Sequence, residues 1–547
     1  MKLMPCGDAA VGLLPEGDGA DLLRRVRAVT AAVQAARIPG MVDVVAAAER
    51  VAVGYDPLAV ADLAGFEAAL REAAVAAASD HGPEAVIHTF PVVYDGPDLA
   101  EVCGQHGLDR DELVALHTAA DYTVEAVGFM PGFGYLSGLP ERLVTPRRAT
   151  PRPVVPAGAV GIGGSQTGVY PCASPGGWHL IGRSPARLFE LTLPQPAILA
   201  VGDRVRFHEA TAAEIPENDA SEVRVGQHQA VPLVPAGASA ITILQPGLFT
   251  TIQDLGRPGY RASGVPLSGA ADRVSLAVAN SLVGNPPGAA AIECTLLGPT
   301  LRFDKAATVA LAGAAFPGLP GGRAIRVTAG TELALGHVTA GCRGYLAVAG
   351  GIDVLEVLGS RSTFVPAGLG GFAGRVLRAG DRLAVGEAGA VTAASGGLPL
   401  QLDTVCRPRV LRAVPGEHAD WFSDAAWGQT FRTSSRSNRM GVRLDGQPLA
   451  GAEGVDRAAA GSLRSIPVFP GAVQVPPDGG PIILLADAQT IGGYPVFGHV
   501  ITADLPVAAQ LRPGDEVCWQ PVSLAEAQAA VREQQAAVAA FAGGQGA

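Results

Sequence analysis

Apolar and polar positions follow two different periods along the chain, and the period changes near residue 120. Before that point Leu22, Val26, Val29 and Val33 recur at spacings of three and four, which predicts a helix. A second helix is predicted after Asp62. Short apolar runs predict strands at 9–14, 41–45, 51–55 and 85–94. The order βαββαβ over residues 1–95 is typical of a ferredoxin-like α+β domain.

A capping box predicts one more helix, because Asp109 and Glu112 stand three residues apart ahead of Leu113 and Leu116. Beyond it, helical periodicity nearly vanishes and one pattern, Leu-x-x-Gly-Asp-x-Val/Leu, occurs at 199–205, 377–383 and 511–517. Each copy follows a Gly-aromatic pair, at Gly177-Trp178, Gly344-Tyr345 and Gly493-Tyr494. Gly-Asp turns are common before strands, but two features recurring in the same order favour three related β-barrel units.

The fold class is therefore mainly β with an α+β cap, and the barrel units are expected near 97–209, 239–386 and 405–520. The predicted domains are a ferredoxin-like domain at 1–95, a first barrel at 96–209, a linker at 210–238, a second barrel at 239–390, a third at 391–522, and a C-terminal helix and tail at 523–547. The terminal helix is interpreted as a docking or solvated appendage.

Composition narrows the function classes. The net charge of −11 opposes binding to nucleic acid or to an anionic membrane. Lys2 and Lys305 are the only lysines, so the sequence contains no P-loop, no biotin-acceptor lysine and no plausible pyridoxal lysine. Phosphate or carboxylate would have to be bound by arginine or by backbone N–H groups.

Localisation is predicted by elimination. The nearest cysteines, Cys294 and Cys342, are 48 residues apart, so no CxxC pair exists, and the seven thiols are interpreted as reduced. Acidic residues within 1–18 argue against a signal peptide, and Pro and Gly interrupt the uncharged stretches at 153–182 and 225–253. A cytoplasmic protein that does not cross a membrane is expected.

Glycine-rich strings at 128–142, 156–171 and 174–183 could form an anion cradle. Its candidate residues are Gly161, Gly163, Gly164, Ser165, Gln166 and Thr167, with Arg183 at the end of the last string. The alternative, weighed as equal, is a series of barrel turns.

Three further segments carry polar side chains that suit catalysis. Gln253, Asp254 and Arg257 lie in TTIQDLGRPGY, and Ser268 or Asp272 follows, where either could cap the next helix. Arg439 and Arg443 lie four residues apart, a spacing that also suits a solvated helix face. The last segment contains Asp487, Gln489, Gly492 and Gly493.

These strings make the chain resemble a known family. Residues 1–209 resemble the allophanate hydrolase subunit 1 family, also called the 5-oxoprolinase B subunit family, through GFMPGF, VPAGAVGIGGSQTGVYP and SPGGWHLIGR. Residues 239–520 resemble the subunit 2 family, also called the 5-oxoprolinase C subunit or biotin-dependent carboxyltransferase-like family, through TTIQDLGRPGY, AVAGGID, GSRST, VPPDG and QTIGGYP. The resemblance implies a fused B–C protein with cyclophilin-like barrels, the first preceded by a ferredoxin-like cap.

The resemblance implies an ATP-dependent lactam hydrolase that uses Mg²⁺ and opens 5-oxo-L-proline to glutamate together with a separate LamB/YcsF-type A subunit. Catalytic roles are then expected for Asp254, Asp487, Arg439 and His117, and carboxylates such as Asp272 could hold a metal or orient water. Substrate or nucleotide contacts are expected from Gly161, Gly163, Gly164, Ser165, Gln166, Thr167, Arg183, Gln253, Arg257, Ser268, Gln489, Gly492 and Gly493.

Two alternatives stay open. Similar domains form the carboxyltransferase of urea or amide carboxylases, which would require a separate biotin carrier, because this chain carries no covalent biotin. Relatives of the first half are non-enzymatic antagonists of a histidine kinase. The sequence also departs from the pattern of the C subunits, with Ala488 and Val496 where basic residues are frequent, so that His499 or Arg439 would have to supply a cation. A homo-oligomer is left open.

Overall fold

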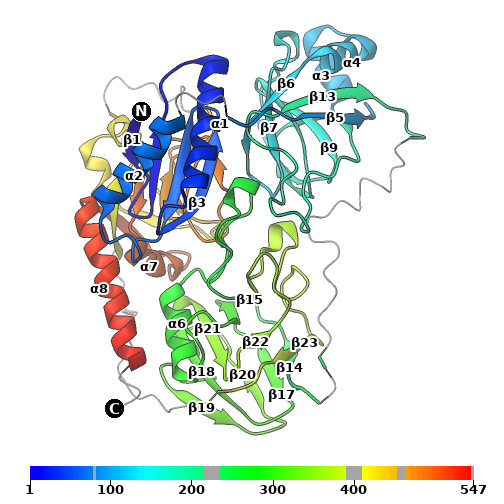
Figure 1. The fold of residues 1–547 in the computed structure, drawn as a ribbon. Helices are drawn as coiled ribbons and strands as arrows, with labels where there is room; N and C mark the ends of the chain where they lie inside the picture. The colour runs from blue at the N-terminus through cyan, green and yellow to red at the C-terminus, as the bar shows by residue number, and fades with distance from the viewer. Residues whose placement is uncertain (78–81, 215–233, 236, 390–408, 453–462, 544–547) are drawn as a thin grey trace.

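The structure is a computed structural model that describes residues 1–547 apart from 78–81, 215–233, 236, 390–408, 453–462 and 544–547 (Figure 1). The described residues form an N-terminal unit (2–76), a first β unit (87–209), a second β unit (239–385) and a third β unit (409–521), followed by one long helix. Most of the predicted linker and the predicted boundary near 387–404 lie outside the described residues.

The N-terminal unit packs two helices on one antiparallel sheet. Its elements are β1 Lys2–Pro5, β2 Ala10–Leu14, α1 Gly19–Ala36, β3 Met41–Ala47, β4 Arg50–Tyr55 and α2 Leu63–Ala76. The sheet order is β1-β2-β4-β3. Val26, Val29 and Val33 of α1 are buried against it, as their spacing predicted, and Asp62 caps α2 through Gly65 N.

The strand predicted at 85–94 as the last strand of this sheet belongs elsewhere, and this expectation is corrected. β5, Ile87–Val92, pairs parallel with β13, Arg204–Glu209, in the first β unit. The edge of the N-terminal sheet beside β2 is taken by β1, whose four residues are all at least partly exposed and gave too weak a pattern for prediction.

The first β unit is a curled sheet with two helices at one end. Its further elements are α3 Leu99–His106, α4 Arg110–Ala119, β6 Tyr122–Val127, β7 Gly134–Ser137, β8 Arg152–Val155, β9 Ala159–Gly163, β10 Gln166–Val169, β11 Ser174–Gly176 and β12 His179–Arg183. The capping box of α4 is confirmed. The strand order is β12-β9-β10-β7-β6-β13-β5, and a bridge between Val93 and Arg183 joins the two edges.

The third β unit repeats this topology as a closed barrel. Its elements are β24 Arg409–Pro415, β25 Phe431–Thr433, β26 Gly441–Asp445, β27 Ile466–Pro467, β28 Ala472–Gln474, β29 Ile482–Leu484, β30 Ile491–Gly492, β31 Val496–Val500, α7 Leu505–Ala509 and β32 Glu516–Pro521. The barrel order is β24-β31-β28-β29-β26-β25-β32. Its first and last strands pair parallel, as β5 and β13 do in the first β unit. When the strands of each barrel are numbered in chain order, the two units have the same order of neighbours.

The second β unit differs, because two sheets sandwich one core. Its elements are β14 Ser239–Gln245, β15 Phe249–Gln253, α6 Arg273–Leu282, β16 Ala291–Thr295, β17 Thr300–Phe303, β18 Ala307–Ala315, β19 Ala324–Val327, β20 Glu332–Ala334, β21 Ala340–Val348, β22 Ile352–Asp353 and β23 Arg382–Val385. The sheet orders are β20-β17-β14-β23-β22 and β15-β16-β21-β18-β19, and both contribute to one apolar core. Three barrels were predicted, and the third β unit forms a closed one.

The Gly-Asp repeat is confirmed as a turn of one geometry before β13, β23 and β32. Gly202, Gly380 and Gly514 have φ of +87°, +89° and +91°. The carboxylate of the following Asp accepts the N–H three residues earlier, at 2.9, 2.7 and 2.8 Å. The Gly-aromatic pair is less regular, since Gly344-Tyr345 lies inside β21 whereas the other two precede β12 and β31.

The last helix, α8 (Leu524–Gly543), docks on the body of the molecule, as one of the two interpretations expected (Figure 1). Ala527, Ala530 and Val531 pack on the third β unit. Val538 packs with α6 of the second. Within the described part of the chain, no helix combines the length and apolarity needed to span a bilayer, and none of the six described cysteines is in a disulfide.

Candidate active site

Arg439 forms the centre of a buried charge network between the second and third β units. It lies just before β26 and donates Nε to Asp487 Oδ2 at 2.8 Å and Nη2 to Asp487 Oδ1 at 3.2 Å. The same guanidinium donates to Glu293 on β16 and, at 2.5 Å, to the carbonyl of Gly269. Burial lowers the pKa of Arg439, but the charges of Asp487 and Glu293 outweigh it and raise the pKa.

A second layer of hydrogen bonds fixes the carboxylates. Tyr345 donates to Glu293 Oε2 at 2.8 Å and accepts the N–H of Asp272 at 2.8 Å. Asp272 caps α6 through Ser275 N at 2.9 Å and accepts from Gln510 at 2.8 Å. Asp272 is thus a helix cap, one of its two expected roles. Arg439 and Asp487, both expected to be catalytic, are buried and paired with each other, and the ion pair of Arg439 with Glu293 holds the loops of the two units together.

Asp254 ties the TTIQDLGRPGY loop to the 357–363 loop. Its Oδ1 accepts from Gly256 N at 2.8 Å and from Ser360 Oγ at 2.7 Å, and its Oδ2 accepts from Arg361 N at 2.6 Å. Arg257 is completely buried and donates to the carbonyls of Ser362 and Val357. Burial lowers the pKa of Arg257 to about 10, with nearby Asp254 opposing the shift.

Several polar atoms of these strings are buried with no hydrogen-bond partner among the described residues. They are Gln253 Oε1, Arg257 Nη1, Ser268 Oγ, Gln474 Nε2 and Thr490 Oγ1. Ser268 also has a left-handed backbone, with φ of +52°. Buried unsatisfied groups cost about 1–3 kcal/mol each, so such a concentration is typical of places that bind water or ligand.

Two glycines let the three β units approach one another closely beside this cluster. A Cβ on Gly128, in the GFMPGF string, would lie 2.5 Å from Ile491 and 2.8 Å from Thr490 Oγ1. A Cβ on Gly264 would lie 2.6 Å from the carbonyl of Met130. Only glycine permits these approaches, which bring strings from both halves of the sequence to one place.

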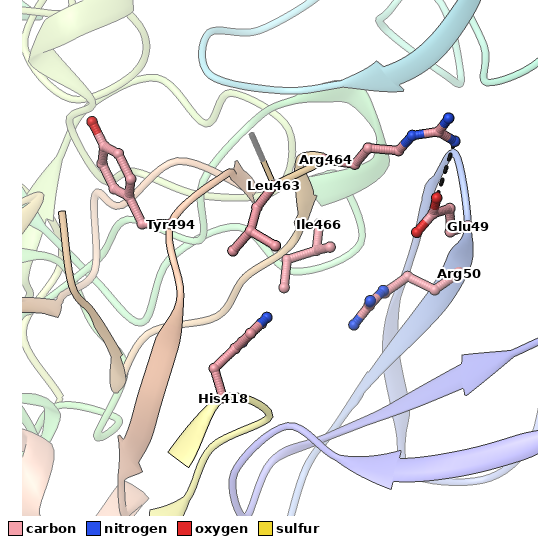
Figure 2. A pocket seen from close by; sticks show the side chains of 7 residues that line it. All are labelled: Glu49, Arg50, His418, Leu463, Arg464, Ile466 and Tyr494. Carbon is pink, nitrogen blue, oxygen red and sulfur yellow. Dashed lines mark ion pairs between the residues drawn. The ribbon is translucent and has the colours of Figure 1, made fainter. Parts of the chain in front are cut away.

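A cavity of about 160 Å³ opens next to the QTIGGYP string, between the N-terminal unit and the third β unit (Figure 2). It is lined by Glu49, Arg50, His418, Leu463, Arg464, Ile466 and Tyr494. Arg50 pairs with Glu417 at 2.5 Å, and Arg464 pairs with Glu49 at 3.0 Å, so both ion pairs frame the opening. In Figure 2 the side chains of Arg50 and His418 face the apolar side chains of Leu463 and Ile466.

His418 offers a defined hydrogen bond donor to this cavity. Its Nδ1 accepts the N–H of Val496 at 3.3 Å, which leaves the proton of the neutral ring on Nε2. Burial lowers the pKa of His418, and the nearby carboxylate of Glu417 opposes the shift. The cavity therefore combines a cation, a neutral N–H donor and an apolar wall.

Most glycines of the predicted anion cradle lie in strands. Gly161 pairs with Gly168 and with Leu180, so β9 is hydrogen-bonded on both sides. A Cβ on Gly163 would lie 2.4 Å from the Trp178 ring, so this glycine makes room for an aromatic side chain. Gln166 donates to Glu125 at 3.2 Å, and Arg183 pairs with Asp95 at 2.9 Å. Only the turn at Gly164 and Ser165 lies between strands.

His117, another residue with an expected catalytic role, lies inside the first β unit. It is completely buried, and Tyr94 Oη lies 2.7 Å from Nδ1. Thr167 Oγ1 donates to the Gly161 carbonyl, so it accepts from His117 Nε2 at 3.0 Å. Burial lowers the pKa of His117 to about 3, which keeps the ring neutral inside the first β unit.

The remaining predicted residues belong to the third β unit, in and around the QTIGGYP string. Gln489 donates to Gln474 at 3.1 Å, and the Gln474 side chain lies against Gly492. Gly493 adjoins Leu463 and precedes Tyr494. Ala488 and Val496 are buried in one apolar cluster. His499 is buried, and burial lowers its pKa to about 4.

Sequence reasoning missed Arg50, His418 and Glu293. Glu293 had a signal, because it stands alone among apolar residues in AIECT, the pattern of a buried charge that needs a partner. Arg50 and His418 had none, since each follows another polar residue near a strand end and resembles a solvated position.

Comparison with known proteins gives two family matches that together span most of the chain. Residues 1–199 match the model described as carboxyltransferase domain, subdomain C and D, and residues 263–521 match carboxyltransferase domain, subdomain A and B. The two halves of the sequence thus match complementary parts of one enzyme domain.

Individual relatives agree with this division. The chain is 40% identical over 305 residues to the C subunit of 5-oxoprolinase from Escherichia coli K12, covering 54% of this chain and 95% of that protein. It is 54% identical over 128 residues to the B subunit of 5-oxoprolinase from Escherichia coli O157:H7, covering 23% of this chain and 59% of that protein. The crystal structure of TTHA0988 superimposes with a TM-score of 0.78 at 34% identity, covering 93% of this chain and 99% of that chain.

Proposed function

The chain belongs to the carboxyltransferase-domain family as a fusion of the B and C subunit types, and from this we propose that it is the B–C component of an ATP-dependent 5-oxoprolinase. In this proposal it opens 5-oxo-L-proline to L-glutamate together with a separate A subunit of the LamB/YcsF type. The named relatives are subunits, which supports a requirement for partner chains.

The observation that carries the proposal is the cavity shared by the two halves. Arg50 comes from the part that matches subdomains C and D, whereas His418 and Tyr494 come from the part that matches A and B. At about 160 Å³ it is smaller than the roughly 300–1,000 Å³ typical of drug-sized ligands, so it suits a small metabolite. Neither half could form it alone.

The lining residues suit a five-membered lactam acid. The Arg50 guanidinium binds a carboxylate, the His418 Nε2–H donates to the lactam oxygen, and Leu463 and Ile466 contact the ring methylenes. The lactam is stabilised by resonance, and phosphoryl transfer to its oxygen would make the ring carbon open to attack by water. To bind the substrate, Arg50 must give up its ion pair with Glu417. A ligand with a carboxylate of its own can replace that partner, so the exchange favours carboxylate ligands.

A magnesium ion in this proposal would be held mainly by the phosphates of the nucleotide. Among the described residues no three His, Cys, Asp or Glu side chains are grouped as a metal site. Mg²⁺ commonly uses one or two carboxylates with phosphate oxygens and water, which is compatible with this donor set.

The test is reconstitution of turnover. The chain alone is expected to form little glutamate, and addition of its cognate A-type subunit with ATP and 5-oxoproline is expected to give steady glutamate release. Arg50→Gln is expected to raise KM at least tenfold, and the exposed Arg432→Gln serves as the control. Full turnover without a partner, or no turnover with one, would contradict the proposal.

A carboxyltransferase is the second candidate, favoured by the description of both matching family models. It would require a separate biotin carrier. Carboxybiotin decarboxylation that depends on urea or a simple amide would support it, and no signal across these acceptors would remove it.

A further inference from the structure

A second depression lies in the first β unit, away from the 160 Å³ cavity. Its volume is about 510 Å³, and its wall includes Glu101 and Gln105 of α3, Arg147, Arg148 and Thr150 of the loop before β8, and His179 at the start of β12. This volume lies within the roughly 300–1,000 Å³ that is typical of ligand pockets.

The loop that carries the arginines (145–150) is held rigidly by the glycine-rich strings. Gly164 N donates to the Thr145 carbonyl at 2.7 Å, and Arg148 N donates to the Gly177 carbonyl at 2.8 Å. His179 Nε2 lies 3.1 Å from the Pro146 carbonyl. The strings at 156–171 and 174–183 thus position the arginine loop.

The charge at this depression is positive on a chain whose net charge is −11. Arg147 is exposed, and no ion pair of Arg147 occurs among the described residues. Arg148 reaches Asp98 at 3.2 Å and Glu101 at 3.5 Å, but its Nε has no hydrogen-bond partner among them. A local cationic excess on an acidic surface attracts anions.

His179 supplies the buried part of the site. It is 4% exposed and lines the depression; its Nδ1 lies 4.0 Å from Glu101 Oε1 and has no hydrogen-bond partner in the described part of the chain. Because Nε2–H donates to the Pro146 carbonyl, Nδ1 is left as an acceptor. A phosphate oxygen that carries a proton can donate to it.

We propose that the depression formed by the arginine loop, α3 and His179 is a binding site for a phosphate-bearing anion, with Arg147 and Arg148 as its cations. This anion is either the polyphosphate of a nucleotide or free phosphate, and the titration below distinguishes them. The site lies in the B-like half, apart from the cavity assigned to the lactam, so a nucleotide bound there would not be the one that donates a phosphoryl group in that cavity.

The test is calorimetric titration of the full chain with ATP–Mg²⁺, ADP and inorganic phosphate at two salt concentrations, without any A-type partner. Wild-type protein is expected to bind, more weakly at high salt. Arg147→Gln is expected to weaken binding at least tenfold and Arg147→Glu to abolish it. Arg142→Gln, an exposed arginine five residues earlier, is the control and is expected to leave affinity unchanged.

Tighter binding of ATP than of phosphate would support a nucleotide site, and equal binding would support a site for free phosphate. No binding at millimolar ligand, or equal affinity in wild type and both Arg147 variants, would overturn the proposal. Because turnover is not measured, this inference and the proposed function fail separately. The Arg147 side chain is exposed, so its variants are expected to fold, and circular dichroism confirms that any loss of binding is local.

Discussion

Several charged side chains are buried away from water. The free-energy cost of burying such a charge depends on whether an oppositely charged side chain lies next to it. Arg439 is 4% exposed and faces Asp487 and Glu293, which are 3% and 1% exposed. Removing one partner of such a group leaves uncompensated buried charge, and the cost is about 3–5 kcal/mol. Surface pairs are worth far less.

Arg439→Gln is therefore expected to lower the free energy of unfolding by about 3–5 kcal/mol, because two carboxylates lose their cation. Arg436→Gln is the matched control, since its ion pair with Asp445 is exposed and little change is expected. Denaturant unfolding of both variants measures the difference. Equal midpoints for the two would contradict the assignment of Arg439 as an interface residue.

Asp43 shows the reverse situation, a buried carboxylate on the N-terminal unit whose ionisation is disfavoured. Its Oδ1 accepts from Gly259 N at 2.9 Å and Arg261 N at 3.1 Å, which fixes the GRPGY turn of the second β unit. Burial raises the pKa of Asp43 to about 6, and the charge of Arg261 only partly opposes it.

Asp43→Asn tests this shift, since the Asn Oδ1 can still accept both N–H groups. The folded wild type holds its proton to a higher pH than the unfolded chain, so the stability from this group is full below pH 4 and is lost as pH rises through about 6. The variant is expected to gain up to about 3 kcal/mol relative to wild type between pH 4 and 7. If denaturant unfolding shows that the free energies of unfolding of wild type and variant change with pH in the same way, the raised pKa of Asp43 is contradicted.

At the scale of elements, sequence patterns predicted best where one local interaction suffices. The Gly-Asp turns, the capping box of α4 and the apolar face of α1 depend on residues a few positions apart, and all three are confirmed. β5 was predicted as a strand but assigned to the wrong sheet, because its partner β13 lies more than a hundred residues later.

The three Gly-Asp turns give a graded prediction. Gly380→Ala and Gly514→Ala are each expected to cost about 1–3 kcal/mol from backbone strain alone, because their φ is positive and a Cβ would meet no atom within 4 Å. Gly202→Ala is expected to cost more, since its Cβ would lie 2.2 Å from Arg27 Cδ.

Gly104→Ala is the control for these substitutions. It is an exposed glycine inside α3 with open space around it, so a gain of about 0.5–1 kcal/mol is expected. Thermal unfolding ranks the four variants. A Gly202 variant no less stable than the other two turn variants would contradict the expected clash.

At the scale of the whole molecule, contacts between the units hold the two halves of the chain together. Asp8 accepts from Thr502 N at 3.0 Å and from its hydroxyl at 2.9 Å, and Ser263 O accepts from Gly132 N at 2.9 Å. α8 then spans the third and second β units from outside. These contacts join the B-like and C-like halves through buried polar groups.

Cutting the chain at a protease site inserted between residues 215 and 233 is therefore expected to leave the halves associated. Size-exclusion chromatography at micromolar concentration is expected to show one species of unchanged size. Asp8→Ala with Asp43→Ala is expected to release part of the N-terminal half after cutting. Two separate peaks from the cut wild type would contradict the prediction that these contacts hold the halves together.

The sequence by itself determined the family, the β-rich architecture, the repeated turns and the strings from which the site is built, because these depend on local spacing and on contiguous residues. Only the tertiary structure decided which side chains meet. It placed Glu293 on Arg439, buried His117 with two hydroxyl partners, and brought Arg50 to His418 across more than 360 residues. Burial and pairing at such distances follow from packing of whole units, and no local pattern encodes them.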